Sequence, residues 1–175
     1  MTNSEDSNKQ EPVHNMLLDK INETLALLES KARYLKVPED YPEYQSLKGK
    51  KILMLDDIER LLEAFLPDLM VATDGNASFV LQKGETAEET AKEILTQNPD
   101  IALLDYSLQE GVKGTDVYEF LKKSGYLGKS IGFSSDKESQ KLFKKAGVED
   151  CIEKDTFDTS AIVKEIAKLV EKQNQ

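Results

Sequence analysis

The sequence predicts an α/β domain in which helices cover both faces of a parallel β-sheet. From Lys51 onward, short apolar runs alternate with amphipathic stretches, and the alternation repeats five times within residues 51–175. The chain has 175 residues, of which 39% are hydrophobic. That length suits one domain of ordinary size with residues to spare, and the apolar content is enough for a core.

Each element follows from the local pattern. The apolar runs predict strands at 51–55, 78–82, 101–104, 130–133 and 150–153. The intervals predict helices at 58–66, 86–97, 115–124, 136–146 and 159–172, with Pro67 ending the first. Between 67 and 78, a short extra strand and a turn at Asp74 and Gly75 are both compatible with the residues. Five such units predict a flavodoxin-like five-stranded parallel sheet of order 2-1-3-4-5.

The first 49 residues differ in character from the rest. Residues 1–11 have no apolar side chain after Met1, so they predict a disordered tail. Residues 12–36 predict an amphipathic helix, because apolar positions recur at steps of three and four. This helix must pack on its own domain or on a second copy, and a charged opposite face favours a homodimer. Residues 37–49, with two prolines, predict a linker.

Composition excludes several functions. A formal net charge of −10 repels nucleic acid and anionic lipid surfaces, so neither is an expected partner. The single cysteine, Cys151, excludes an intramolecular disulfide and a thiolate zinc site. No apolar run is long enough to span a bilayer, and the polar start does not resemble a secretory signal. A cytoplasmic protein is therefore expected.

Three carboxylates stand at the ends of predicted strands. Asp56 and Asp57 directly follow the first strand, and Asp105 follows the third. Ligands of an open parallel sheet bind outside the carboxyl ends of its strands, and strands one and three are neighbours at the switch point. Carboxylates that converge there either hold protons or bind a hard cation, for which Mg²⁺ is the economical choice.

Two further strand ends add a hydroxyl and a positive charge. Ser134 and Ser135 follow the fourth strand, and Ser134 is favoured unless the strand ends one residue later. Lys154 follows the fifth strand and offers a compact ammonium group. Acids, a divalent cation, a hydroxyl and an ammonium at one point form a site for a phosphoryl group. Asp105, alone on its strand, is the candidate nucleophile.

The segments that carry these residues resemble the receiver domain of two-component response regulators, including single-domain regulators of the chemotaxis type. The matching segments are KILMLDD, PDIALLDYSL, the Gly114 that opens the next helix, SIGFSS and AGVEDCIEK. They keep the order and spacing of that family over about residues 50–173, so residues 50–175 are expected to form a receiver domain. No single motif is specific, whereas five in order are.

The resemblance implies a role for each site residue. Asp56 and Asp57 would hold Mg²⁺ together with Asp105 and the backbone carbonyl of Ser107. Asp105 would accept a phosphoryl group from a histidine kinase or a histidine phosphotransfer protein. Ser134 would bind a phosphoryl oxygen, and Lys154 would pair with the phosphoryl group. Such a module is a signalling switch rather than a turnover enzyme, and its output passes through contact with a downstream protein.

The sequence departs from the family pattern in three places. Asp155 replaces the proline that usually follows the lysine, and Cys151 stands where the family often carries a switching aromatic residue. The loop after Asp105 is one residue longer than its commonest form. A small core residue is the simplest interpretation of Cys151.

Two other functions compete with the phosphorylated switch. A degenerate receiver would serve as an unphosphorylated interaction module, and the departures at Cys151 and Asp155 favour it. A Mg²⁺-dependent phosphohydrolase of the haloacid dehalogenase type also uses an aspartyl nucleophile, but its motif spaces two aspartates by one residue, unlike LDDIE. The sequence names neither the cognate kinase nor the downstream target.

Overall fold

A computed structural model describes residues 42–154 and 158–172 of the chain. The predicted tail 1–11 and the amphipathic helix 12–36 lie outside the described residues, as does Asp155. The homodimer expected through residues 12–36 therefore stays a prediction.

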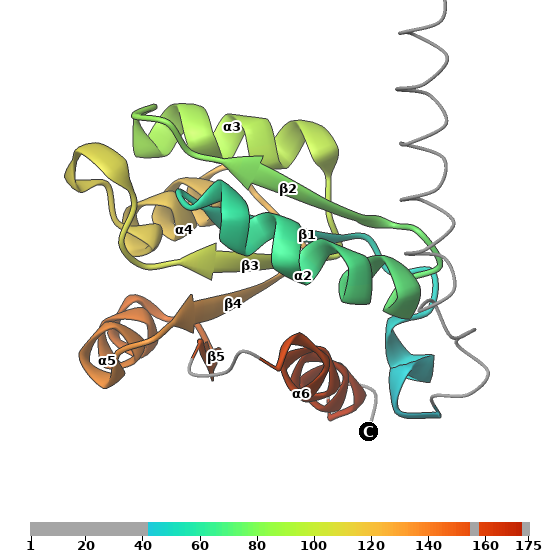
Figure 1. Ribbon diagram of the computed structural model, residues 1–175. Coiled ribbons are helices and arrows are strands. Elements are labelled where there is room, and N and C mark those ends of the chain that lie inside the picture. Colours follow the sequence, from blue (N-terminus) through green and yellow to red (C-terminus); the bar gives the residue numbers. More distant parts are fainter. Residues whose placement is uncertain (1–41, 155–157, 173–175) are drawn as a thin grey trace, which may run out of the picture. The chain divides into compact units, whose positions relative to one another are not determined.

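Five parallel strands form one sheet in the order β2-β1-β3-β4-β5, which confirms the predicted flavodoxin-like topology (Figure 1). The strands are β1 (Ile52–Asp56), β2 (Ala77–Leu81), β3 (Ile101–Asp105), β4 (Lys129–Ser134) and β5 (Asp150–Glu153). Every residue of β1 and β3 is buried, because helices cover both faces of the centre of the sheet. The apolar runs predicted each strand to within one residue at either end.

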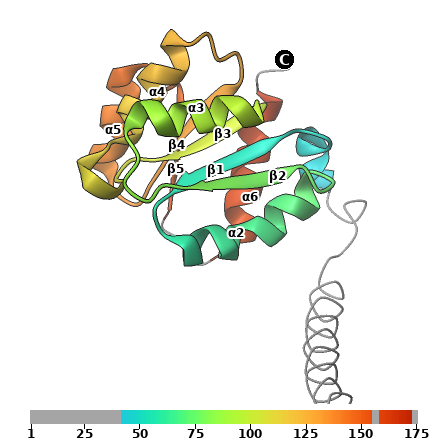
Figure 2. The same ribbon diagram turned by 90° about the horizontal axis from the view of Figure 1, so that it is seen from above.

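Helices pack on the two faces of the sheet. They are α2 (Glu59–Ala72), α3 (Ala87–Gln97), α4 (Gly114–Lys123), α5 (Lys137–Ala146) and α6 (Thr159–Glu171). Helices α2 and α6 lie on one face of the sheet, and α3, α4 and α5 lie on the other (Figure 2). Side chains of α2 and α6 join one core cluster, and side chains of α3, α4 and α5 join the other. Along β1, Ile52 and Met54 face the first cluster whereas Leu53 and Leu55 face the second. This alternation is the period of two that a strand imposes on its side chains.

Part of the segment expected as linker is structured. Pro42–Leu47 forms a 3₁₀ helix, η2, in which Tyr44 and Leu47 are buried in the α2 and α6 cluster. The Ser46 hydroxyl donates to the Ala167 carbonyl of α6 at 3.1 Å. The two prolines of this segment predicted a linker, but burial of Tyr44 and Leu47 stabilises the turn against the domain.

Helix α2, predicted at 58–66, does not end at Pro67. It continues to Ala72 with Pro67 inside, on the exposed side. Leu69 and Ala72 are buried beyond the proline, and their burial offsets the lost backbone hydrogen bond. The extra strand considered within 67–78 is also wrong. The turn at Asp74 and Gly75 is confirmed, since both have positive φ, 55° and 87°.

Pro67→Ala should raise the free energy of unfolding by about 1 to 2 kcal/mol, because it restores a backbone donor and removes the clash of the ring with the preceding turn. Urea denaturation measures this change. Pro67→Gly is the matched control, since it restores the same donor but is expected to be about 1 kcal/mol less stable than the alanine variant. An alanine variant less stable than wild type would show that the proline contributes packing that the exposed position does not suggest.

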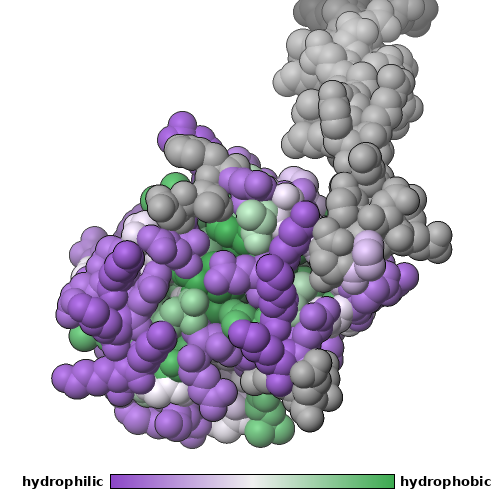
Figure 3. All heavy atoms as spheres, turned by 90° about the horizontal axis from the view of Figure 1, so that it is seen from below, coloured by the Kyte–Doolittle hydropathy of each residue, from purple (hydrophilic) through white to green (hydrophobic). Residues whose placement is uncertain are grey.

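Hydrophilic side chains cover most of the described surface seen from below, where they surround a small hydrophobic hollow (Figure 3). Among the described residues, no helix combines the length and the apolar character needed to cross a bilayer.

Candidate functional site

The acidic cluster forms where the two central strands end. Asp56 is the last residue of β1 and is fully buried, and Asp105 is the last residue of β3 and is 6% exposed. Asp57 follows and is half-buried. One carboxylate oxygen from each of the three lies within 4.8 Å of the others. The predicted convergence of these side chains is therefore present.

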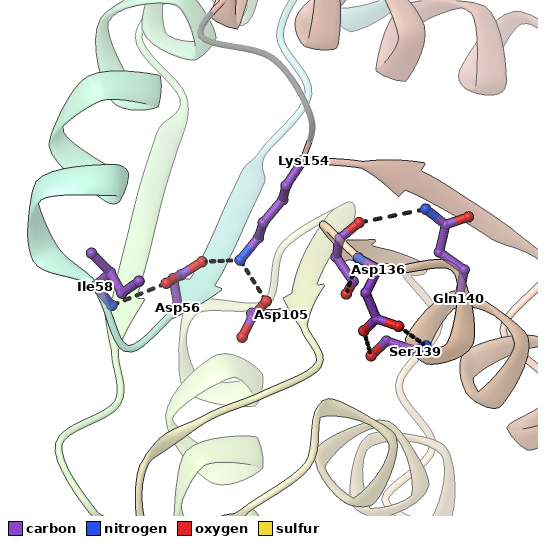
Figure 4. Close-up of polar contacts among 8 residues, drawn as sticks. Asp56, Ile58, Asp105, Asp136, Ser139, Gln140 and Lys154 are labelled. Carbon is purple, nitrogen blue, oxygen red and sulfur yellow. Dashed lines mark hydrogen bonds and ion pairs between the residues drawn. The ribbon is translucent and has the colours of Figure 1, made fainter.

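Lys154 reaches the same point from β5 (Figure 4). Its Nζ lies 2.5 Å from Oδ2 of Asp56 and 2.5 Å from Oδ1 of Asp105. The ammonium group also lies 5.0 Å from the centroid of the Phe133 ring, and only 9% of the lysine side chain is exposed. The Lys154 amide donates to the Ser134 carbonyl at 3.1 Å, which extends the pairing of β4 with β5 and fixes the base of the lysine side chain.

Electrostatics at Asp105 favour a proton or a cation. Burial raises the pKa of the Asp105 carboxyl above its ordinary value, and the charge of Asp56 acts in the same direction. Lys154 opposes both through its charge and its hydrogen bond, and so lowers the pKa in part. The buried carboxylate therefore gains from any additional positive charge close to it.

Ser134 is buried as the last residue of β4, whereas Ser135 is exposed. Oγ of Ser134 accepts a hydrogen bond from the Asp136 amide at 3.4 Å, and its carbonyl accepts from Gln140 Nε2 at 3.4 Å. Among the described residues, the structure gives Ser134 no side-chain hydrogen bond to the acidic cluster. Its phosphoryl-binding role stays a prediction.

Asp136 fixes the helix that follows Ser134. Its Oδ1 accepts from the amides of Glu138 and Ser139 at 2.8 and 3.1 Å, and its Oδ2 accepts from the Ser139 hydroxyl (Figure 4). Asp136 is thus the N-cap of α5, and these bonds lower the pKa of its carboxyl. The cap sets where the chain turns after β4.

The loop after β3 carries Ser107, which forms an isolated antiparallel bridge with Lys113 and is exposed. The loop ends at Gly114, which packs directly against the backbone of Asp105. A Cβ at Gly114 would lie 2.0 Å from the Asp105 carbonyl oxygen and 2.9 Å from Cζ of Phe143. Only glycine allows α4 to begin this close to the candidate phosphoacceptor. A metal-ligating role for the Ser107 carbonyl stays a prediction.

Cys151 lies half-buried on β5 and packs against the α3, α4 and α5 cluster. Burial raises the pKa of its thiol, so the reactive thiolate is disfavoured. These properties agree with a packing residue and not with a reactive thiol.

Sequence reasoning missed Gln82, which follows β2 and is 1% exposed. Its backbone amide donates to the Asp56 carbonyl at 3.0 Å, so it borders the acidic cluster. Its position is the signal that could have indicated it, because Gln82 directly follows the apolar run of β2 as the aspartates follow theirs.

The donor set fits a hard divalent cation. All three side chains offer carboxylate oxygens, which Mg²⁺ prefers, and they carry more negative charge than Lys154 can neutralise alone. Together with a nucleophilic carboxylate and an ammonium group, such a site can bind a phosphoryl group and accept it covalently.

The fold and the position of this cluster define the class of structure. No protein-family model matches the sequence, and no curated protein matches it. Solved structures do match, and the chain has the fold of response regulator receiver domains.

Three of these structures show the extent of the likeness. A receiver domain protein described as CheY-like, from Methanospirillum hungatei, has a TM-score of 0.57 and 22% identity over 71% of this chain and 96% of that chain. The Francisella response regulator 1452 receiver domain has a TM-score of 0.54 and 17% identity over 72% and 99%. The N-terminal domain of an uncharacterized protein from Wolinella succinogenes has a TM-score of 0.58 and 15% identity over 72% and 97%.

Proposed function

We propose that the chain is a phospho-accepting signalling switch whose acceptor is Asp105. The observation that carries this proposal is the meeting of three carboxylates and the Lys154 ammonium at the carboxyl end of a receiver-type sheet. The expected donor is a histidine kinase or a histidine phosphotransfer protein, and the output passes by contact to a downstream protein. A cytoplasmic location remains part of this proposal.

The chemistry assigned to Asp105 is nucleophilic. An oxygen of its carboxylate attacks the phosphorus of the donor, an O–P bond forms, and the bond to the donor breaks with its electron pair leaving on the donor atom. Lys154, already beside this carboxylate, neutralises charge on the phosphoryl oxygens. The Ser134 hydroxyl, whose oxygen accepts from the Asp136 amide, would donate its O–H to one of those oxygens.

Asp56, Asp57, Asp105 and the Ser107 carbonyl would hold Mg²⁺. When bound, the cation supplies positive charge to the phosphoryl oxygens and relieves repulsion among the carboxylates. Asp56 and Asp57 would position the cation and would not themselves react. The chain would catalyse only its own phosphorylation and dephosphorylation.

Incubation with Mg²⁺ and a small acyl phosphate, followed by intact mass spectrometry, tests the proposal. The expected result is a gain of one phosphoryl group that depends on Mg²⁺. Asp57→Asn should slow the gain strongly, because it removes one expected metal ligand and leaves Asp105 intact. No gain at any Mg²⁺ concentration would contradict phosphorylation and favour the unphosphorylated interaction module.

A further inference from the structure

Gln82 joins two loops beside the acidic cluster. Its side chain Oε1 accepts a hydrogen bond from the Gln109 amide at 2.9 Å, and its Nε2 donates to the Glu85 carbonyl at 2.7 Å. Its own amide donates to the Asp56 carbonyl at 3.0 Å. One buried residue thus connects the end of β1, the loop that precedes α3 and the loop that follows Asp105.

The loop after Asp105 needs such a connection. Gln109–Gly111 forms a single 3₁₀ turn, η3, in which Glu110 has φ of 53°, a left-handed conformation that non-glycine residues rarely adopt. A strained residue persists only where the surrounding structure fixes it. Leu108, 6% exposed, anchors one side of the turn in the core, and Gln82 holds the other side through the Gln109 amide.

The two loops also lie against each other. A Cβ added to Gly84 would lie 3.4 Å from Cγ of Glu110, so the loop after β2 passes close to the strained residue. The Leu108 amide donates to the Val112 carbonyl at 3.1 Å and closes the turn. Displacement of Gln109 would therefore move the whole segment that begins at Ser107.

The glutamine side chain satisfies both partners at this place. Its amide group offers a donor and an acceptor at one end of a three-carbon reach, whereas glutamate is acceptor-only when ionised and leucine offers neither. Removal of the Gln82 amide group leaves the Gln109 amide and the Glu85 carbonyl without their hydrogen bonds to this side chain, so both loops lose their connection through it.

We propose that Gln82 is a positioning residue for the metal and phosphoryl site, and that it acts by holding the loop of Ser107 in place. This inference rests on the proposed function, since it assumes that the Ser107 loop contributes to Mg²⁺ binding. Gln82 does not touch the reacting atoms. It acts through the Gln109 amide.

The first test compares Gln82→Leu with wild type in the full-length chain without metal. Hydrogen exchange of the Gln109 amide should become at least about tenfold faster, because its acceptor is lost. Titration calorimetry with MgCl₂ should then show an affinity several-fold weaker than in wild type. Gln97→Leu is the matched control, since Gln97 accepts from the Ser78 hydroxyl at 2.7 Å on α3 and does not border the cluster. It should leave the Mg²⁺ affinity unchanged.

A second variant distinguishes positioning from a general loss of stability. Gln109→Pro removes the amide N–H that donates to Oε1 of Gln82. Proline suits the first position of this turn, which follows extended Leu108. If Gln82 acts through that proton, the effects of Gln82→Leu and Gln109→Pro on Mg²⁺ affinity should be smaller together than their sum. Should Gln82→Leu fail to fold, Gln82→Glu replaces it: it keeps an acceptor and should retain slow exchange at Gln109.

The outcomes separate the two proposals. Wild type that binds Mg²⁺, with Gln82→Leu binding it equally well, overturns the positioning role and leaves the proposed function standing. Wild type that fails to bind Mg²⁺ overturns the metal site and this inference with it. Additive effects of the two substitutions would also overturn the role assigned to the Gln109 amide.

Discussion

Asp105→Asn should abolish the Mg²⁺-dependent gain of one phosphoryl group while the fold remains intact. The substitution keeps the size of the side chain but removes the carboxylate that acts as the nucleophile, and an amide oxygen is a poor replacement. Intact mass spectrometry after incubation with the acyl phosphate measures the effect. Asp74→Asn is the matched control, because Asp74 is exposed in a turn at φ 55°, a conformation that asparagine tolerates.

Asp105→Asn should also change the stability of the protein in a way that depends on pH. Because burial raises the pKa of the Asp105 carboxyl above 3.8, the folded state holds the proton more tightly than the unfolded chain does. Ionised Asp105 therefore costs stability at neutral pH, and wild type should become relatively more stable as the pH falls through the raised pKa toward 3.8. Without Mg²⁺, Asp105→Asn should be more stable than wild type at pH 7, and the difference should shrink on acidification.

Urea denaturation at a series of pH values checks this prediction. If Asp105→Asn gains mass at the wild-type rate, a residue other than Asp105 is the phosphoryl acceptor. A variant that is less stable than wild type at pH 7 would mean that the bond from Lys154 outweighs the cost of burying the Asp105 charge.

The sheet and its acidic cluster were predictable because both depend on local patterns. An unbroken apolar run such as ILML of β1 is the expected sequence of a strand buried on both faces, and the next residue must then lie at the edge of the sheet. Asp56 and Asp105 are each such a residue, on adjacent strands. Parallel topology brings the ends of adjacent strands together, so their convergence follows from order alone.

What the sequence did not reveal depends on tertiary packing. The helix through Pro67 persists because Leu69 and Ala72 are buried beyond it, and no local propensity indicates this. Gln82 directly follows an apolar run, as the aspartates do. Its proposed role, however, depends on the Gln109 amide, 27 residues further along the chain. Side chains that act through a distant backbone group leave no spacing that a single sequence can display.

Lys154→Met should destabilise the metal-free protein by about 3 kcal/mol, because it leaves two buried carboxylates without their shared cation. Lys154 lies 2.5 Å from both Asp56 and Asp105, and methionine replaces most of its length without its charge. The pKa of Asp105 should rise further, since Lys154 is the group that lowers it most. Lys123→Met is the control, because its ion pair with Glu119 is exposed and such pairs contribute at most about 1 kcal/mol.

Added Mg²⁺ should stabilise the Lys154→Met variant more than it stabilises wild type. If the cation binds the same carboxylates, it supplies the positive charge that the Lys154→Met variant lacks, and it binds the folded state in preference to the unfolded chain. The increase in unfolding free energy on adding Mg²⁺ should therefore be larger for Lys154→Met than for wild type, in which the ammonium group already lies between Asp56 and Asp105. Urea denaturation with and without saturating MgCl₂ measures both increments. An equal increment in the two proteins would mean that the cation does not share these carboxylates with Lys154. A variant as stable as wild type without Mg²⁺ would mean that the ion pairs of Lys154 with the two aspartates contribute no net stability.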